Sequence, residues 1–122
     1  MRTADQPTAH VVVALSGQDQ DDADTVFSAL RTAFGSDRPA DDVPQAATGG
    51  RPVVWTATFD ASDVRDEPAA ARLSAPVSAT LQGAYTDVDS LRRALTAAFS
   101  VRIVGTASGD QEEEVQLRLE SR

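Results

Sequence analysis

The sequence predicts an α+β fold, and two internal similarities carry that prediction. The segment 22–34 (DADTVFSALRTAF) resembles the segment 87–99 (DVDSLRRALTAAF), with Asp, Ala and Phe identical and aliphatic residues at matching positions. Upstream of each, the segments 10–17 and 77–83 also resemble one another, and each ends in glycine. Each half therefore reads as a strand, a glycine-containing turn, an acid-capped helix and a further strand. We interpret this pattern as an internal duplication.

Both helices are predicted from apolar residues at helical spacing. Four aspartates lie at the start of the first helix: Asp19, Asp21, Asp22 and Asp24. Their carboxylates can accept hydrogen bonds from the free amides of the first helical turn. We expect capping rather than cation binding here, and we expect Gly35 to end the helix. The apolar stripes are Ala23, Val26, Phe27, Leu30, Ala33 and Phe34 in the first helix, and Val88, Leu91, Leu95, Ala98 and Phe99 in the second.

The second helix is expected to begin at Thr86. Asp89 follows three residues later, as in a capping box, in which two side chains satisfy free amides at the start of a helix.

Strands are predicted where apolar and polar residues alternate. The predicted strands are 9–15, 53–59, 77–82, 101–106 and 114–120. Residues 1–8 are expected to form a flexible N-terminal tail, and residues 9–122 a single α+β domain. Proline, glycine and aspartate are frequent in 35–52 and in 60–75, so both are expected to be mobile loops.

The order of elements, β-α-β-β-α-β with one further strand, resembles the ferredoxin-like sandwich over about residues 9–107. The resemblance implies an antiparallel sheet with both helices on one face and a strand order of 2-3-1-4. The added C-terminal strand would pair at the edge, which gives 2-3-1-4-5. That fold hosts many unrelated activities, so the resemblance implies no function.

The alternation of side chains assigns each strand a core face and an open face. The expected core residues are Val11, Val13, Leu15, Val53, Trp55, Ala57, Phe59, Val77, Ala79, Leu81, Ile103, Val115, Leu117 and Leu119. The candidate partner or ligand residues on the open face are His10, Val12, Thr56, Thr58, Thr80, Arg102, Val104 and Arg118. This mixture suits a face that meets a partner or a ligand, and it also suits a solvated, Thr-rich sheet.

Composition excludes several classes of function. The formal net charge is -8, which disfavours binding to nucleic acid or to an anionic membrane. The chain has no cysteine, so disulfides and thiol chemistry are excluded. Its longest apolar run, 11–15, is far shorter than a membrane span, and its first residues do not resemble a signal peptide. The expected location is the cytoplasm.

No motif for catalysis or for a cofactor stands out. There is neither a Gly-x-Gly-x-x-Gly pattern nor a Walker lysine nor a nucleophile elbow, and the acidic segment from Asp19 lacks the spacing of an EF-hand. His10 is the single side chain with an ordinary pKa near neutrality, but the sequence places no orienting partner beside it. We therefore expect no cofactor, no metal and no catalytic residue.

The leading hypothesis is a small, non-catalytic association or ligand-binding domain that acts through its open sheet face. Its partner would be a second copy, an unidentified protein or a small-molecule ligand. The alternative is a cofactor-free enzyme of the dimeric α/β-barrel kind, resembling a monooxygenase or cyclase, that acts on a small apolar substrate. A pocket near His10, Arg102 and Trp55 would favour the alternative, whereas a shallow open face would favour association.

Overall fold

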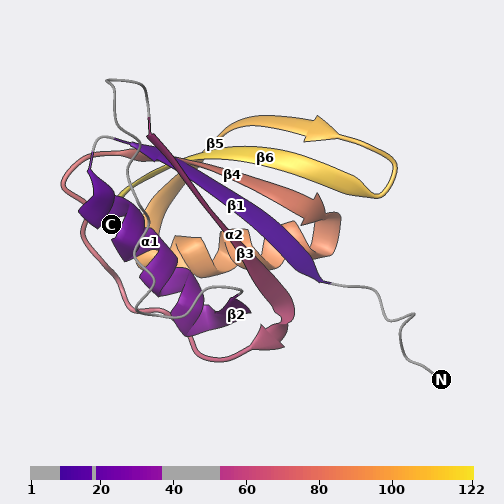
Figure 1. Ribbon diagram of the computed structural model, residues 1–122, viewed down its shortest axis with the longest axis horizontal. Coiled ribbons are helices and arrows are strands. Elements are labelled where there is room, and N and C mark those ends of the chain that lie inside the picture. The colour runs from indigo at the N-terminus through magenta and orange to yellow at the C-terminus, as the bar shows by residue number, and fades with distance from the viewer. Residues whose placement is uncertain (1–8, 18, 37–52) are drawn as a thin grey trace.

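The computed structural model describes residues 9–17, 19–36 and 53–122, which form an antiparallel sheet of six strands and two helices (Figure 1). The predicted tail, 1–8, and most of the predicted loop 35–52 lie outside the described residues. The elements are β1 (His10–Gly17), α1 (Gln20–Ala33), β2 (Phe34–Ser36), β3 (Val53–Val64), β4 (Val77–Ala84), α2 (Tyr85–Ala98), β5 (Phe99–Ser108) and β6 (Glu112–Ser121).

The strand order is β2-β3-β1-β4-β6-β5, and both helices lie on one face of the sheet (Figure 1). Two segments with the same order of elements, β-α-β-β, follow one another along the chain, and their first strands β1 and β4 pair at the centre. The central pairs Val12–Gln82, Ala14–Thr80 and Ser16–Ser78 are arranged symmetrically about the middle one. A local two-fold axis therefore passes through the pair Ala14–Thr80.

The outer strands follow the same symmetry. In the first half, Ser36 of β2 pairs with Phe59 of β3, and in the second half Val101 of β5 pairs with Leu119 of β6. The register also shifts once in each half, but at positions that are not equivalent: between Phe34 and Gly35 in the first half and between Ile103 and Gly105 in the second. Apart from these shifts, the similarity between the halves extends from residue types to the register of the strands.

The helices also match at their ends. Each has 14 residues, and each stops at a phenylalanine in extended conformation, Phe34 or Phe99, whose amide donates to the carbonyl of Leu30 or Leu95. At the start of α1, the Asp19 carboxylate accepts from the amide of Asp21 at 2.9 Å, as an N-cap does. Of the four aspartates at the start of this helix, Asp19 is therefore the one that caps it.

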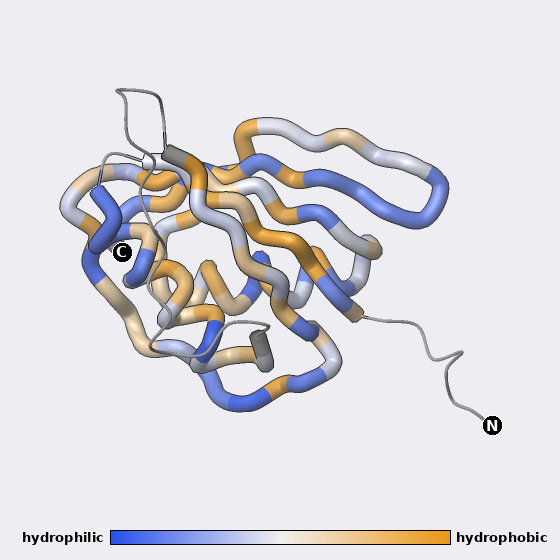
Figure 2. The backbone as a smooth tube through the Cα atoms, in the orientation of Figure 1, coloured by the Kyte–Doolittle hydropathy of each residue, from blue (hydrophilic) through white to orange (hydrophobic). Residues whose placement is uncertain are grey.

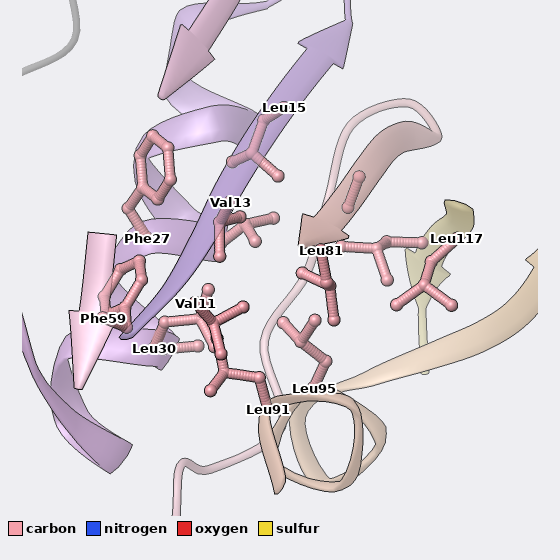
Figure 3. Packing of buried hydrophobic residues seen from close by; sticks show 14 of the residues in the cluster. Val11, Val13, Leu15, Phe27, Leu30, Phe59, Leu81, Leu91, Leu95 and Leu117 are labelled. Carbon is pink, nitrogen blue, oxygen red and sulfur yellow. The ribbon is translucent and has the colours of Figure 1, made fainter. Parts of the chain in front are cut away.

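The core lies between the helices and one face of the sheet. Figure 3 shows Leu30, Leu91 and Leu95 from the helices against Val11 and Leu81 from the central strands. The rings of Phe27 and Phe59 lie 6.1 Å apart in a tilted arrangement. The alternation therefore assigns the core face correctly, except that Ile103, which lies on the edge strand β5, is 52% exposed. The burial of Val53 lies outside the described residues.

The expected strand order 2-3-1-4-5 is wrong. In the numbering of the five predicted strands, the observed order is 2-1-3-5-4, with the additional strand β2 outside strand 2. The physical reason is β2. This strand has only three residues and overlaps the start of the predicted loop 35–52, so the sequence pattern does not predict it. The chain passes from α1 into β2 at one edge of the sheet, and β3 then pairs between β2 and β1. In the second half, the chain passes from α2 into β5 at the other edge, and β6 pairs between β5 and β4.

Three local expectations also need correction. Gly35 does not end α1 but lies in β2, where a Cβ atom would come within 2.2 Å of the Asp63 carboxylate. Thr86 does not cap α2, since Ala84 occupies the N-cap without a side-chain hydrogen bond. The predicted loop 60–75 begins only after Val64, where β3 ends.

The connection 65–76 joins the two halves and crosses the helix layer. The amides of Arg65 and Asp66 donate to carbonyls at the end of α1. At the other end of α1, the buried carboxylate of Asp22 accepts from the amide and the hydroxyl of Ser74, at 2.9 and 2.7 Å, and from the amide of Ala75 at 3.2 Å. Asp22 thus fixes the connection to the helix.

Candidate functional site

The face of the sheet that carries no helix holds the predicted site residues, and we call it the open face. It consists of alternate residues of the paired strands: His10, Val12, Ala14 and Ser16 in β1, Val54, Thr56, Thr58 and Asp60 in β3, Ser78, Thr80 and Gln82 in β4, Glu112, Glu114, Gln116, Arg118 and Glu120 in β6, and Ser100 and Arg102 in β5. The pairing of the strands orders these residues into rows across the sheet.

The middle rows are uncharged around β1. Thr56 and Thr80 flank Ala14 on its two neighbouring strands, and Thr58 pairs with Val12. Thr56 is exposed, while Thr58 and Thr80 are half-buried by their neighbours. These residues therefore lie together near the centre of the open face, as the alternation predicts.

Two predicted site residues form a cationic corner. Arg102 on β5 pairs directly with Arg118 on β6, and both are exposed. The guanidinium of Arg118 donates to Glu120 at 3.1 Å, whereas Arg102 makes neither a hydrogen bond nor an ion pair with the described residues. Like charges on directly opposed positions of two strands repel, so this corner is suited to an anionic group.

His10 lies in a different part of the open face. It is exposed, and it pairs with Asp60 on β3. The amide and hydroxyl of Ser62 donate to the Asp60 carboxylate, and these bonds, with a smaller contribution from His10, hold the pKa of Asp60 below its usual value. Strands β4 and β6 separate His10 from Arg102, so the two do not form one site.

Trp55 lies on the opposite, helix-covered face, where it is buried. The set His10, Arg102 and Trp55, which would favour an enzyme, is therefore not brought together.

Val104 is exposed, and it lies at the bulge of β5 between Ile103 and Gly105. Because β6 lies between β5 and the central strands, Val104 is at the edge of the sheet.

Sequence reasoning missed the acidic members of the open face. Each of these acidic residues lies an even number of positions from other open-face residues of its strand. They are Asp60 in β3 and Glu112, Glu114 and Glu120 in β6, which share the open face with Gln116. Figure 2 shows the hydrophilic end of β6 and the turn that joins it to β5. The alternation within the predicted strand 114–120 was sufficient to place Glu114 and Glu120 on the open face. Asp60 was missed because the predicted strand ended at residue 59, whereas β3 continues to Val64.

Two grooves described in the structure lie on the helix side. One, of about 360 Å³, is lined by the end of α1, the start of the connection and Ala94 and Ala97 of α2. The other, of about 370 Å³, lies between α1 and residues 68–71. Neither groove includes a predicted site residue.

Within the described ranges, no group of three or more His, Asp or Glu residues could hold a metal ion. The helices described here are also too short and too polar to cross a membrane. Comparison with known proteins gave no match: no family model, no curated protein and no solved structure matches the chain.

Proposed function

We propose that this protein is a non-catalytic association domain and that two copies pack through their open faces. The observation that carries the proposal is the composition of that face. Val12 is 43% exposed and Val54 is 57% exposed, among small hydroxyl residues that neither repel a partner nor require much dehydration. Two twisted sheets can pack face to face at a small angle, with the side chains of both faces in contact.

The charges on β6 support a second copy as the partner. Glu114, Gln116 and Arg118 lie in succession on the open face of this strand. A two-fold axis through Gln116 would place Glu114 of each copy against Arg118 of the other. Isologous dimers require a self-complementary surface of this kind, and complementary charges favour one register over others.

We do not propose the enzymatic alternative, the dimeric α/β-barrel type. No observation favours it, since Trp55 faces the helices and His10 is distant from Arg102 along the sheet.

The first test is the mass in solution, measured by light scattering from low to high micromolar concentration. We expect twice the monomer mass of 12.9 kDa. The double variant Thr56→Glu/Thr80→Glu should be a folded monomer, because it places unpaired negative charges in the contact, where their dehydration is costly. The control Thr32→Glu/Thr86→Glu makes the same change of charge at exposed positions on the helices and should remain dimeric.

A charge exchange tests the register. Arg118→Glu alone should weaken the dimer, and the addition of Glu114→Arg should restore it. A monomeric wild type at high micromolar concentration, or an exchange variant no tighter than Arg118→Glu, would contradict the proposal.

A further inference from the structure

Strand β5 forms one edge of the sheet as described. It pairs with β6 on one side and with no described strand on the other. Alternate residues of an edge strand direct their amides and carbonyls outward, where they can bind a further strand. The opposite edge offers much less, because β2 has only three residues.

The β5 edge has few of the features that normally block strand addition. The segment 99–108 contains no proline and a single charge, Arg102. One bulge interrupts its pairing between Ile103 and Gly105. From Arg102 to Ser108 its residues are exposed, apart from half-buried Gly105, and this part of the β5–β6 hairpin projects at the upper right of Figure 1.

The two faces of β5 differ in chemistry. On the open face, Arg102 lies beside Arg118 and has no carboxylate partner among the described residues. On the helix face, Val101 is half-buried and Ile103 is 52% exposed, opposite the buried Leu119 and Leu117. A strand added at this edge would therefore place one set of alternate side chains beside cations and the other set beside apolar groups.

We propose that the β5 edge binds an extended segment of another protein in which acidic and apolar residues alternate. Backbone pairing with β5 would supply affinity, and the carboxylates would pair with Arg102 while the apolar side chains cover Ile103. The net charge of -8 does not prevent this, because charges beyond about 8 Å are largely screened at physiological ionic strength.

A second copy does not fit this edge as well. If two β5 strands paired, neither would bring a carboxylate to Arg102, since Arg102 is the only charged residue in 99–108. The partner is therefore a strand of different sequence. This inference goes beyond the proposed dimer, which uses the centre of the open face and β6 and leaves the β5 edge uncovered.

The probe is a fluorescent peptide, Thr-Val-Glu-Val-Glu-Val-Thr with blocked ends, whose binding is followed by anisotropy. It should bind saturably, and Arg102→Glu should weaken it about tenfold. The control Arg72→Glu reverses an exposed arginine away from this edge and should change the affinity less than about twofold. The same peptide with lysine in place of glutamate should bind Arg102→Glu more tightly than it binds the wild type.

Backbone pairing is tested separately. Two versions of the peptide are made, and each is N-methylated on a different set of alternate residues. Each version therefore has one of its two hydrogen-bonding edges blocked. One version should lose binding to β5, and the other should retain it. Absence of saturable binding, equal loss in Arg72→Glu and Arg102→Glu, or indifference to both methylated versions would each overturn the proposal. Measurement on the monomeric variant Thr56→Glu/Thr80→Glu keeps this result independent of whether the open faces dimerise.

Discussion

The two halves of the molecule share one architecture but not one environment. Helices α1 and α2 have equal length and equivalent ends, and both direct an apolar stripe at the sheet. In α1 the buried set is wider than in α2, because Asp22, Phe27 and Ala29 are buried in addition to the four positions that are buried in both helices. Their counterparts in α2, Asp87, Arg92 and Ala94, are only half-buried. The connection 65–76 accounts for part of this difference in burial, because it forms hydrogen bonds with α1 at both ends, at Asp22 and at Ala33.

The outer strands differ in the opposite sense. Three residues of β2 are described, while β5 has ten, and from Arg102 to Ser108 these are exposed apart from half-buried Gly105. The first half thus has a more covered helix, and the second half has a more exposed edge. Equivalent positions can therefore be exchanged or truncated in pairs to ask which differences affect stability.

The largest contrast is expected between Phe27 and Arg92, which occupy equivalent positions. Phe27→Ala should lower the free energy of unfolding by about 4–5 kcal/mol, because the ring is fully buried against Phe59. Arg92→Ala should cost less than about 1 kcal/mol, since it removes a partly exposed ion pair with Asp89. Chemical denaturation of both variants measures the contrast, and equal losses would show that the two environments are alike.

Phe34 and Phe99 test the opposite expectation, that equivalent helix ends contribute equally. Both are buried where a helix passes into a strand. Truncation of either to alanine should cost about 3–4 kcal/mol. Melting and denaturant curves of the two single variants provide the comparison; clearly unequal losses, or no loss in either variant, would contradict the expected equivalence in packing.

The role of the connection is tested at Asp22 and its counterpart Asp87. Asp22→Ala should cost about 2–3 kcal/mol, because it leaves the amides of Ser74 and Ala75 without their charged acceptor. Asp87→Ala should cost at most about 1 kcal/mol, the usual contribution of a carboxylate in a first helical turn. Hydrogen exchange should show faster opening of the connection in Asp22→Ala, and unchanged exchange there would argue against this role.

The smallest effect is expected at Asp89. A hydrogen bond from Arg92, with the nearby charge of Arg93, holds the pKa of Asp89 below its usual value near 3.8. Because the folded pKa is lower than the unfolded one, the stabilisation is present above the unfolded pKa and is lost as the pH falls through the folded pKa. Asp89→Asn should therefore cost about 0.3–0.5 kcal/mol at neutral pH.

That difference should disappear once the pH is below the folded-state pKa of Asp89, where the wild-type carboxyl is protonated. The equivalent Asp24 lies 3.6 Å from Arg31, a longer separation. Asp24→Asn serves as the matched variant. A pH dependence larger at Asp24 than at Asp89 would reverse the comparison.

The candidate site was predictable in part. The period of two in the strands placed Thr56, Thr80 and Arg118 on the open face, since successive side chains of a strand point to opposite faces. The juxtaposition of Arg102 with Arg118 also follows from a hairpin between the last two strands. The distance of His10 from Arg102 did not follow, because it depends on which strands lie between them.

The sequence by itself determined both helices, the core face of each strand and the similarity of the two halves, all of which depend on local spacing of apolar side chains. Only the tertiary structure decided the strand order, the burial of Asp22 and the exposure of the β5 edge. Strand order depends on backbone pairing between distant segments, which leaves no periodic signal in either one. Here a three-residue strand, too short to be recognised from its composition, determined where the neighbouring strands could pair.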